Sequence, residues 1–182
     1  PRLNDCYNYL LEKKKQGVIK HIGVSVNSPN DLLNFDRDIK FEMAQCNFNL
    51  LDQRLYENKL KTFILKNNIN IVARTIFCFG FFSEKFLNGQ LNLNKNDHRT
   101  TWKIKQLNLW KKGLLRIKNL DKDGLAIEEI ALKFAISEKL IKSSLIGVQD
   151  CDELKNNIVI TNTKQINKKF LNQIKKICIE ND

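Results

Sequence analysis

The sequence predicts an α/β protein built on a parallel sheet, as a single domain over residues 1–182. Four short apolar segments are separated by longer segments with helical periodicity, and this alternation is typical of β/α units. The 182 residues include 42% hydrophobic residues, which is enough for one domain with a packed core. Because the apolar segments read as buried throughout, we expect helices on both faces of the sheet.

The first half of the chain contains three of the predicted strands. A helix in "LNDCYNYLLEKKKQG" precedes a strand near residues 18–25, and Ser28 and Pro29 then begin a helix as N-cap and first helical residue. Strands near 41–46 and 69–74 flank a helix in "ENKLKTFILKNN". The apolar residues of the first helix share one face; they are Leu3, Tyr7, Leu10 and Leu11.

The second half is mostly helical. A helix is predicted from about residue 99 to 120, and "LAIEEIALKFAIS" has the clearest helical spacing of apolar residues. A fourth strand near 142–147 follows, then a short helix in "DELKNNI" and an amphipathic helix over about 166–177. The regular spacing in "LAIEEIALKFAIS" involves Ile127, Ile130, Ala131 and Phe134.

Polar residues come directly after the buried strands. "SVN" begins at Ser25, "QCN" at Gln45, "RTIF" at Arg74 and "IGVQ" at Ile146. A single strand can end in polar residues for purely structural reasons. That explanation is weaker when all four strands end in this way. Ligands of parallel α/β proteins bind beyond the carboxyl ends of the strands, so these ends predict a ligand site.

The composition favours an intracellular protein. No apolar segment approaches the roughly 20 residues that cross a membrane, and no secretory leader begins the chain. Five cysteines without a CxxC pair predict free thiols in the cytoplasm. The net charge of 31 − 20 = +11 is compatible with a phosphate- or nucleic-acid-binding surface. Nucleic acid is not the favoured partner, because the lysines are scattered and few aromatic residues lie among them.

Five segments carry a resemblance to a known family. In chain order they are "GVIKHIGVSVNSP", "AQCNFNLLDQR", "IVARTIFCFGFFSEKF", "DHRTTW" and "SSLIGVQDCDELKNNI". From about Leu10 to about Ile158 the chain resembles an aldo-keto reductase. The resemblance implies a partial (β/α)8 TIM barrel: about four β/α units, strands five to eight, with extra helices. It also implies the reduction of a carbonyl to an alcohol by NADPH, with NADH as the open alternative.

The resemblance assigns the first three strand ends to the nicotinamide and diphosphate of the cofactor. Ser25 and Gln45 match residues that hold the nicotinamide carboxamide. Val26 stands where the family commonly has asparagine, and Asn27 is the candidate substitute. The residues after strand seven match positions that pack on the nicotinamide ring or approach the pyrophosphate; these are Arg74, Thr75, Phe77 and Gly80. A guanidinium plane can stack on a ring, so Arg74 suits its position.

The loop after the fourth strand matches a loop that wraps the adenosine. Gly147 would allow close approach of the backbone. Gln149 stands where the family often has lysine or arginine for the 2′-phosphate, and a neutral amide binds a phosphate dianion less well. Glu153 and Asn157 match positions that contact adenine.

No catalytic residue is assigned in this chain. The family's tyrosine proton donor and its lysine, aspartate and histidine partners come from the first half of the barrel. The contexts of Tyr7, Tyr9 and Tyr56 do not match the donor. We expect His21 to pack beside the sheet, and His98 to order its loop by hydrogen bonding.

Three functions stay open at the sequence level. The first is an oxidoreductase fragment that acts on a small carbonyl substrate and is inactive alone, because its catalytic half is a missing N-terminal segment or a partner chain. The second is a non-enzymatic half-barrel that binds a partner or self-associates. The third is a basic domain that binds phosphate or nucleic acid.

Overall fold

The computed structural model describes residues 3–36, 38–121 and 123–177, in which four parallel strands form one sheet. Neighbours along the chain are neighbours in the sheet, in the order β1-β2-β3-β4. This confirms the four predicted parallel strands. The first is shorter than predicted, and Val18, at its predicted start, is 69% exposed. The strands are β1 (Gly23–Ser25), β2 (Met43–Asn47), β3 (Asn70–Arg74) and β4 (Ile141–Ser144).

Helices fill the connections between the strands. Ser28 and Pro29 do begin a helix, but it is a short 3-10 helix, η1 (Pro29–Asn34). The other 3-10 helices are η2 (Arg54–Tyr56), η3 (Cys78–Gly80) and η4 (His98–Thr101). The α-helices are α1 (Leu3–Lys15), α2 (Asn58–Lys66), α3 (Glu84–Leu87), α4 (Ile104–Leu120), α5 (Ile127–Ser137), α6 (Cys151–Asn162) and α7 (Lys168–Ile174).

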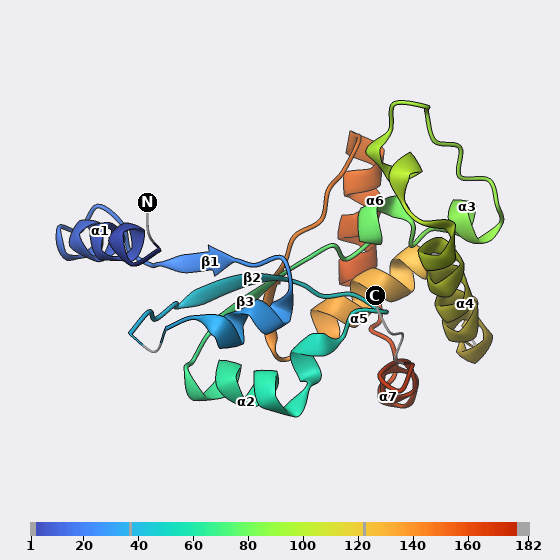
Figure 1. Cartoon of the computed structure of the whole chain (residues 1–182). Coiled ribbons are helices and arrows are strands. Elements are labelled where there is room, and N and C mark those ends of the chain that lie inside the picture. The colour runs from blue at the N-terminus through green and yellow to red at the C-terminus, as the bar shows by residue number, and fades with distance from the viewer. Residues whose placement is uncertain (1–2, 37, 122, 178–182) are drawn as a thin grey trace.

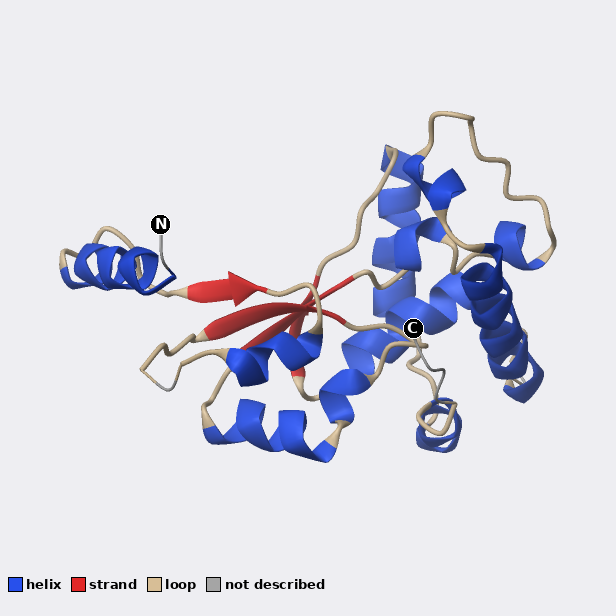
Figure 2. Cartoon of the chain, in the orientation of Figure 1, coloured by secondary structure: helices blue, strands red, loops and turns tan. Residues whose placement is uncertain are grey.

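Helices cover one face of the sheet only. Figure 1 shows η1 and α2 below β1–β3, with little above these strands. Figure 2 shows the same view with helices in blue and strands in red. Ala44 and Cys46 are fully buried, whereas Met43 is 37% exposed and Gln45 is half-buried. The expectation of helices on both faces is therefore wrong for these strands. Successive side chains of a strand point to opposite faces of the sheet. In so short an apolar segment this alternation was not apparent, so the open face could not be recognised from the sequence.

The core lies between the covered face and the helices that pack on it, which include η1, α2, α5 and α7. The regular apolar positions of α5 are all fully buried, as predicted. Phe134 of α5 stacks on Phe48, which follows β2, with ring centroids 5.4 Å apart. Phe170 and Ile174 of α7 are buried in the same cluster. This packing fixes the position of the carboxyl ends of the strands.

The helix α1 lies beyond the amino ends of the strands, away from the core (Figure 1). The helix was predicted, but its apolar face is not buried: none of its residues is buried, and Leu3 is 50% exposed. Periodicity defines a face of a helix without identifying what covers it. The tyrosine hydroxyl of Tyr7 bonds the backbone of Lys40, and Lys14 pairs with Glu42.

The long connection between β3 and β4 stands at the carboxyl end of the sheet (Figure 1). It contains α3, η4, α4 and α5, and α4 begins at Ile104 instead of near residue 99. The rings of Trp102 and Trp110 lie 4.9 Å apart and both contact Phe81. This aromatic cluster anchors the connection beside the strand ends.

Candidate functional site

Ser25 and Gln45 meet at the carboxyl edge of the sheet. They are direct partners in the register of β1 and β2, so their side chains lie on the same face. The Ser25 hydroxyl donates a hydrogen bond to Gln45 Oε1 at 3.1 Å. The two side chains therefore lie together, as expected for polar residues at the carboxyl ends of parallel strands. Their role in binding a ligand stays a prediction.

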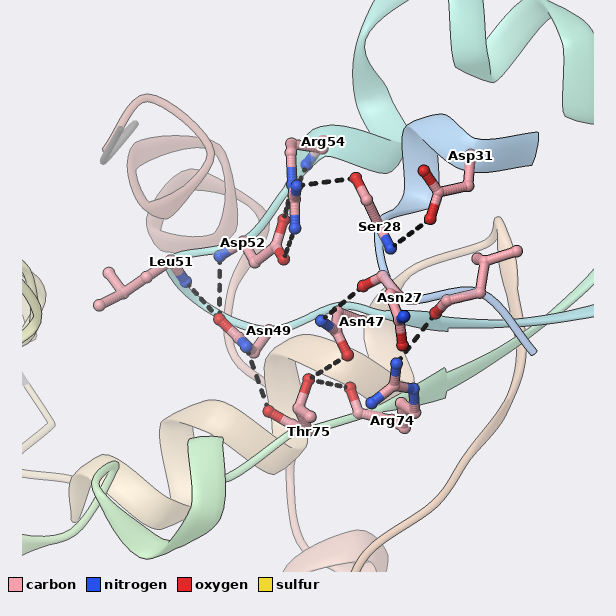
Figure 3. Close-up of polar contacts among 11 residues, drawn as sticks. Asn27, Ser28, Asp31, Asn47, Asn49, Leu51, Asp52, Arg54, Arg74 and Thr75 are labelled. Atoms are coloured by element: carbon pink, nitrogen blue, oxygen red, sulfur yellow. Dashed lines mark hydrogen bonds and ion pairs between the residues drawn. The ribbon is translucent and has the colours of Figure 1, made fainter. Parts of the chain in front are cut away.

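Arg74 joins this edge from β3. Its Nη2 donates to the carbonyl oxygen of Val26 at 2.9 Å, reaching across β2 to the end of β1. The Arg74 Nε is buried without a hydrogen-bond partner. Asn47 makes the parallel contact, from its Nδ2 to the carbonyl oxygen of Asn27 at 3.3 Å. Figure 3 shows both contacts converging above the strand ends. Asn27 thus reaches the site through its backbone, and its side chain is exposed.

Thr75 links the edge to the loop after β2. Its backbone is left-handed, with φ of 62°. Its hydroxyl lies 2.6 Å from the Arg74 carbonyl oxygen and 3.4 Å from Asn47 Oδ1. The Asn49 side chain donates to the Thr75 carbonyl at 3.1 Å and accepts from the backbone of Asp52 (Figure 3). A buried polar network therefore fixes the loop at the site.

An ion pair, Arg54–Asp52, supports the same loop. Arg54 binds Asp52 through Nε and Nη2, at 2.8 and 2.6 Å, and its Nη1 donates to Ser28 Oγ at 3.0 Å. The hydrogen bonds that Arg54 donates to Asp52 raise the pKa of Arg54 above its usual value. Because Ser28 is the N-cap of η1, the pair connects the loops that follow β1 and β2.

A cavity of about 420 Å³ opens beside this network, within the size range of small-molecule sites. Strand-end residues form one wall, and the long connection forms the other. The first wall includes Asn47, Asn49, Asp52, Arg54 and Thr75, and the second includes Cys78, Phe79, Thr101, Trp102, Lys103, Gln106 and Trp110. Of the predicted site residues, Thr75 alone lines it. Phe77 and Gly80 lie in the same turn, where Phe77 is half-buried.

The loop after β4 forms a separate group. The Gln149 backbone N–H donates to Glu153 Oε2 at 2.7 Å, so Glu153 closes its own loop. Open space lies where Gly147 would carry a side chain. Asn157 is 5% exposed, and its Nδ2 is buried without a partner. Within the described part of the chain, none of these four residues lines the cavity.

The pair Asp97–Arg99 is the main feature that sequence reasoning missed. Hydrogen bonds from Arg99 lower the pKa of Asp97 to about 2. The expectation that His98 orders this loop is wrong: the His98 side chain is 72% exposed, and its Nδ1 lies 3.7 Å from Asp97 Oδ1. The signal was present, since an aspartate two residues before an arginine can cap the turn and pair with it.

Three titratable groups, His21, Tyr56 and Cys46, do not line the cavity. His21 is exposed and pairs with Glu42 at the amino edge of the sheet. The Tyr56 hydroxyl donates a hydrogen bond to Glu138. Burial is the larger cause of the raised pKa of Tyr56, and this hydrogen bond is the second cause. Burial also raises the pKa of Cys46, to about 12. Cys46 and Cys78 are buried free thiols, Cys6 and Cys151 are exposed ones, and Cys178 lies outside the described residues.

Neither a metal-binding cluster nor a membrane-spanning helix lies in the ranges that the structure describes. No cluster of three or more histidine, cysteine or acidic residues there could hold a metal ion. No helix in those ranges has the length and apolar character of a membrane span.

Comparison with protein families gives one match over nearly the whole chain. The family model described as "Aldo/keto reductase family" matches residues 3–179. An uncharacterized oxidoreductase of Bacillus subtilis (strain 168) is 22% identical over 155 residues, 85% of this chain and 49% of the relative. L-glyceraldehyde 3-phosphate reductase of Escherichia coli (strain K12) is 25% identical, over 94% of this chain and 53% of the relative. The chain thus spans about half the length of the curated relatives it matches.

Solved structures share the fold. The apo form of the aldo-keto reductase AKR11C1 from Bacillus halodurans superposes with a TM-score of 0.73 at 18% identity, over 98% of this chain and 58% of that one. The glycerol dehydrogenase AKR11B4 from Gluconobacter oxydans gives a TM-score of 0.72 at 17% identity, over 92% of this chain and 51% of that one. The four-stranded sheet is therefore consistent with part of a TIM barrel.

Proposed function

The chain belongs to the aldo/keto reductase family, and from this premise we propose that it is the cofactor-binding half of an NAD(P)H-dependent carbonyl reductase. The observation that carries the proposal is the Ser25–Gln45 pair at the carboxyl edge of the sheet. A primary carboxamide has one acceptor oxygen and two N–H donors, and a hydroxyl beside an amide complements both. We assign the nicotinamide amide to this pair.

Unused hydrogen-bonding groups support the fit of a dinucleotide. Arg74 Nε and Asn157 Nδ2 are both buried donors without a partner, and such groups are rare unless something satisfies them. In the proposal, Arg74 packs on the nicotinamide ring, while Thr75, Phe77 and Gly80 lie near the diphosphate. Asn157 is assigned to the adenosine end.

The loop after β4 bears on the choice between NADPH and NADH. We propose NADPH, with Gln149 near the 2′-phosphate and the open space at Gly147 receiving the adenosine. Gln149 is exposed and uncharged, so it would discriminate between the two dinucleotides only weakly. Glu153 would act indirectly, because its carboxylate already binds the Gln149 backbone.

The residues of this chain would bind and orient, and the reacting groups would come from elsewhere. When bound, the reduced nicotinamide supplies a hydride. A carbonyl oxygen also needs a proton, and we propose that its donor lies outside this chain, in the first half of the barrel. Tyr56 and His21 are engaged with Glu138 and Glu42, away from the cavity. The substrate class we propose is a small carbonyl compound, and the name of the Escherichia coli relative makes a phosphorylated aldehyde a reasonable first test.

The experiment is a titration of the full chain with NADPH and with NADH, followed by nicotinamide fluorescence. We expect weak binding, because in the proposal this chain supplies only one side of the cofactor pocket. A Gln45→Ala variant should bind the dinucleotide roughly two- to tenfold more weakly than the parent chain. Gln16→Ala is the matched control, because Gln16 is an exposed glutamine at the far end of the molecule. Binding of neither dinucleotide, or equal effects of the two variants, would overturn the proposal.

The uncovered sheet face supports a second candidate, a half-barrel that binds another chain without catalysis. Met43 is 37% exposed on that face, and β1 and β4 are the outer strands of the sheet. The partner would be the missing first half or a second copy of this chain. Under either function we propose a cytoplasmic protein, because the buried thiols of Cys46 and Cys78 are free.

A further inference from the structure

The turn after β3 has an unusual backbone. Cys78, Phe79 and Gly80 are consecutive left-handed residues, with φ of 46°, 58° and 82°. Glycine adopts this conformation freely, but cysteine and phenylalanine do so rarely. Such a conformation persists only where the surroundings determine it, and it is frequent at ligand-binding sites. Something must therefore hold this turn.

Arg99 braces the turn from the long connection. Its Nη1 donates to the carbonyl oxygen of Phe79 at 3.0 Å. Its Nε and Nη2 bind both oxygens of Asp97 at 2.6 to 3.1 Å, and the two side chains are each 19% exposed. A side chain on Gly80 would come within 3.0 Å of the same Nη1. The guanidinium fork thus fits the turn on one side and the carboxylate on the other.

The braced turn also forms a wall of the cavity. Phe79 is 45% exposed, and its ring lies 5.2 Å from that of Trp102, which in turn lies 4.9 Å from Trp110. All three rings line the cavity. Trp102 follows η4, whose N-cap is Asp97. One ion pair therefore controls both the backbone of the turn and the aromatic wall facing it.

We infer that Asp97 and Arg99 are positioning residues, which hold the turn 78–80 and the aromatic wall in the shape that receives the dinucleotide. The inference rests on the proposed function for the identity of the ligand. Arg99 acts through the Phe79 carbonyl and the wall, so a change at Arg99 alters ligand affinity and aromatic packing while the part of the core under the sheet stays folded.

The test compares Arg99→Leu, Arg99→Lys and Asp97→Asn in the full chain. Three quantities are measured: NADPH affinity by calorimetry, the near-ultraviolet circular dichroism of the aromatic wall, and the melting temperature. For Arg99→Leu we expect about 10- to 100-fold weaker binding, because the charge-assisted hydrogen bonds that hold the turn are lost. Its aromatic signal should fall, and its melting temperature should stay near that of the parent.

Arg99→Lys should rescue only part of the affinity, because an ammonium cannot bond Phe79 and both oxygens of Asp97 together. Asp97→Asn, which keeps the size of the side chain, tests the pair if Arg99→Leu does not fold. Arg116→Leu is the matched control, an exposed arginine on α4 that should change nothing.

The outcomes separate the two proposals. If the parent chain binds no dinucleotide, the proposed function fails. The near-ultraviolet circular dichroism of the variants then decides by itself whether Asp97 and Arg99 hold the turn and the aromatic wall. An unchanged aromatic signal in Arg99→Leu and Asp97→Asn would overturn the inference. Parent-like NADPH affinity in both variants, when the parent does bind, would overturn it as well.

Discussion

At the scale of single residues, Glu138 shows how a buried charge joins distant parts of the chain. It lies at the end of α5, with a side chain 3% exposed. Lys175, just after α7, places its Nζ 2.8 Å from Glu138 Oε1, and the Tyr56 hydroxyl donates to the other oxygen. The Lys175 ammonium also lies 5.1 Å from the centre of the Tyr56 ring. One carboxylate thus connects η2, α5 and α7.

We expect Glu138→Ala to lower the free energy of unfolding by about 3 kcal/mol. Removing one partner of a buried ion pair typically costs about 3–5 kcal/mol, and Lys175 is 33% exposed, so water offsets part of the loss. Urea denaturation measures the change. Glu12→Ala, an exposed helical glutamate, is the control and should change stability by about 0.5 kcal/mol or less. A similar loss in both variants would contradict the role given to Glu138.

The sequence predicted individual residues unevenly. The proximity of Ser25 and Gln45 could be predicted, because parallel strands end at one edge and both residues follow apolar segments. The brace by Arg99 could not be predicted in the same way. Its partner Phe79 is distant along the chain, and the left-handed φ of that residue depends on tertiary contacts that no local pattern encodes.

At the scale of elements, the helices with regular apolar spacing were predicted best. The spacing in α5 identified four residues that are all fully buried. The predicted helix α1 was confirmed, and none of its residues is buried, because amphipathic spacing does not say what covers the face. The short α3 was not predicted, since its four residues are too few to show a helical period.

We expect acid to release α1 before the rest of the molecule unfolds. Hydrogen bonds from His21 and Lys14 lower the pKa of Glu42 from 4.5 to about 2. A carboxylate with a lowered pKa stabilises the folded state above its unfolded pKa and loses that contribution as the pH falls through the folded pKa. Protection of α1 amides from hydrogen exchange should therefore fall between pH 4.5 and about 2.

A Glu42→Gln variant should show low α1 protection already at pH 7, because its amide cannot form the ion pair with Lys14. Asp38→Asn is the control: Asp38 is an exposed acidic residue that precedes β2. Protection of α1 that stays constant down to pH 2 in the parent chain would show that Tyr7 and its contact with Lys40 suffice to hold the helix.

At the scale of the whole molecule, the open face of the sheet dominates. Gly23, Ser25, Met43 and Gln45 share a face that the helices leave uncovered. The chain spans about half of its curated relatives, so a complete barrel would need a second half against this face. A partial barrel was predictable only from the ordered family motifs, because local patterns do not encode barrel closure.

We expect the chain alone to oxidise NADPH no faster than background with a panel of aldehydes. Under the proposed function the general acid and the opposite wall lie outside this chain. Loss of a general acid typically lowers a rate by about 10²–10⁴-fold, and loss of a wall removes orientation as well. Adding a separately produced first half of a related barrel should restore turnover, measured as the loss of NADPH absorbance. Steady turnover by the repurified chain alone, abolished in Gln45→Ala, would contradict this division of roles.

The order of the strands in the sheet has a consequence for biosynthesis. Because β1, β2 and β3 are consecutive along the chain and across the sheet, each can pair with its predecessor as the nascent polypeptide leaves the ribosome. The fourth strand emerges only after α3, α4 and α5 have been made. Loop-closure entropy grows slowly with length, so this delay weakens the final pairing little. Until then β3 presents a free edge, and the nascent chain is most exposed to mispairing at that stage.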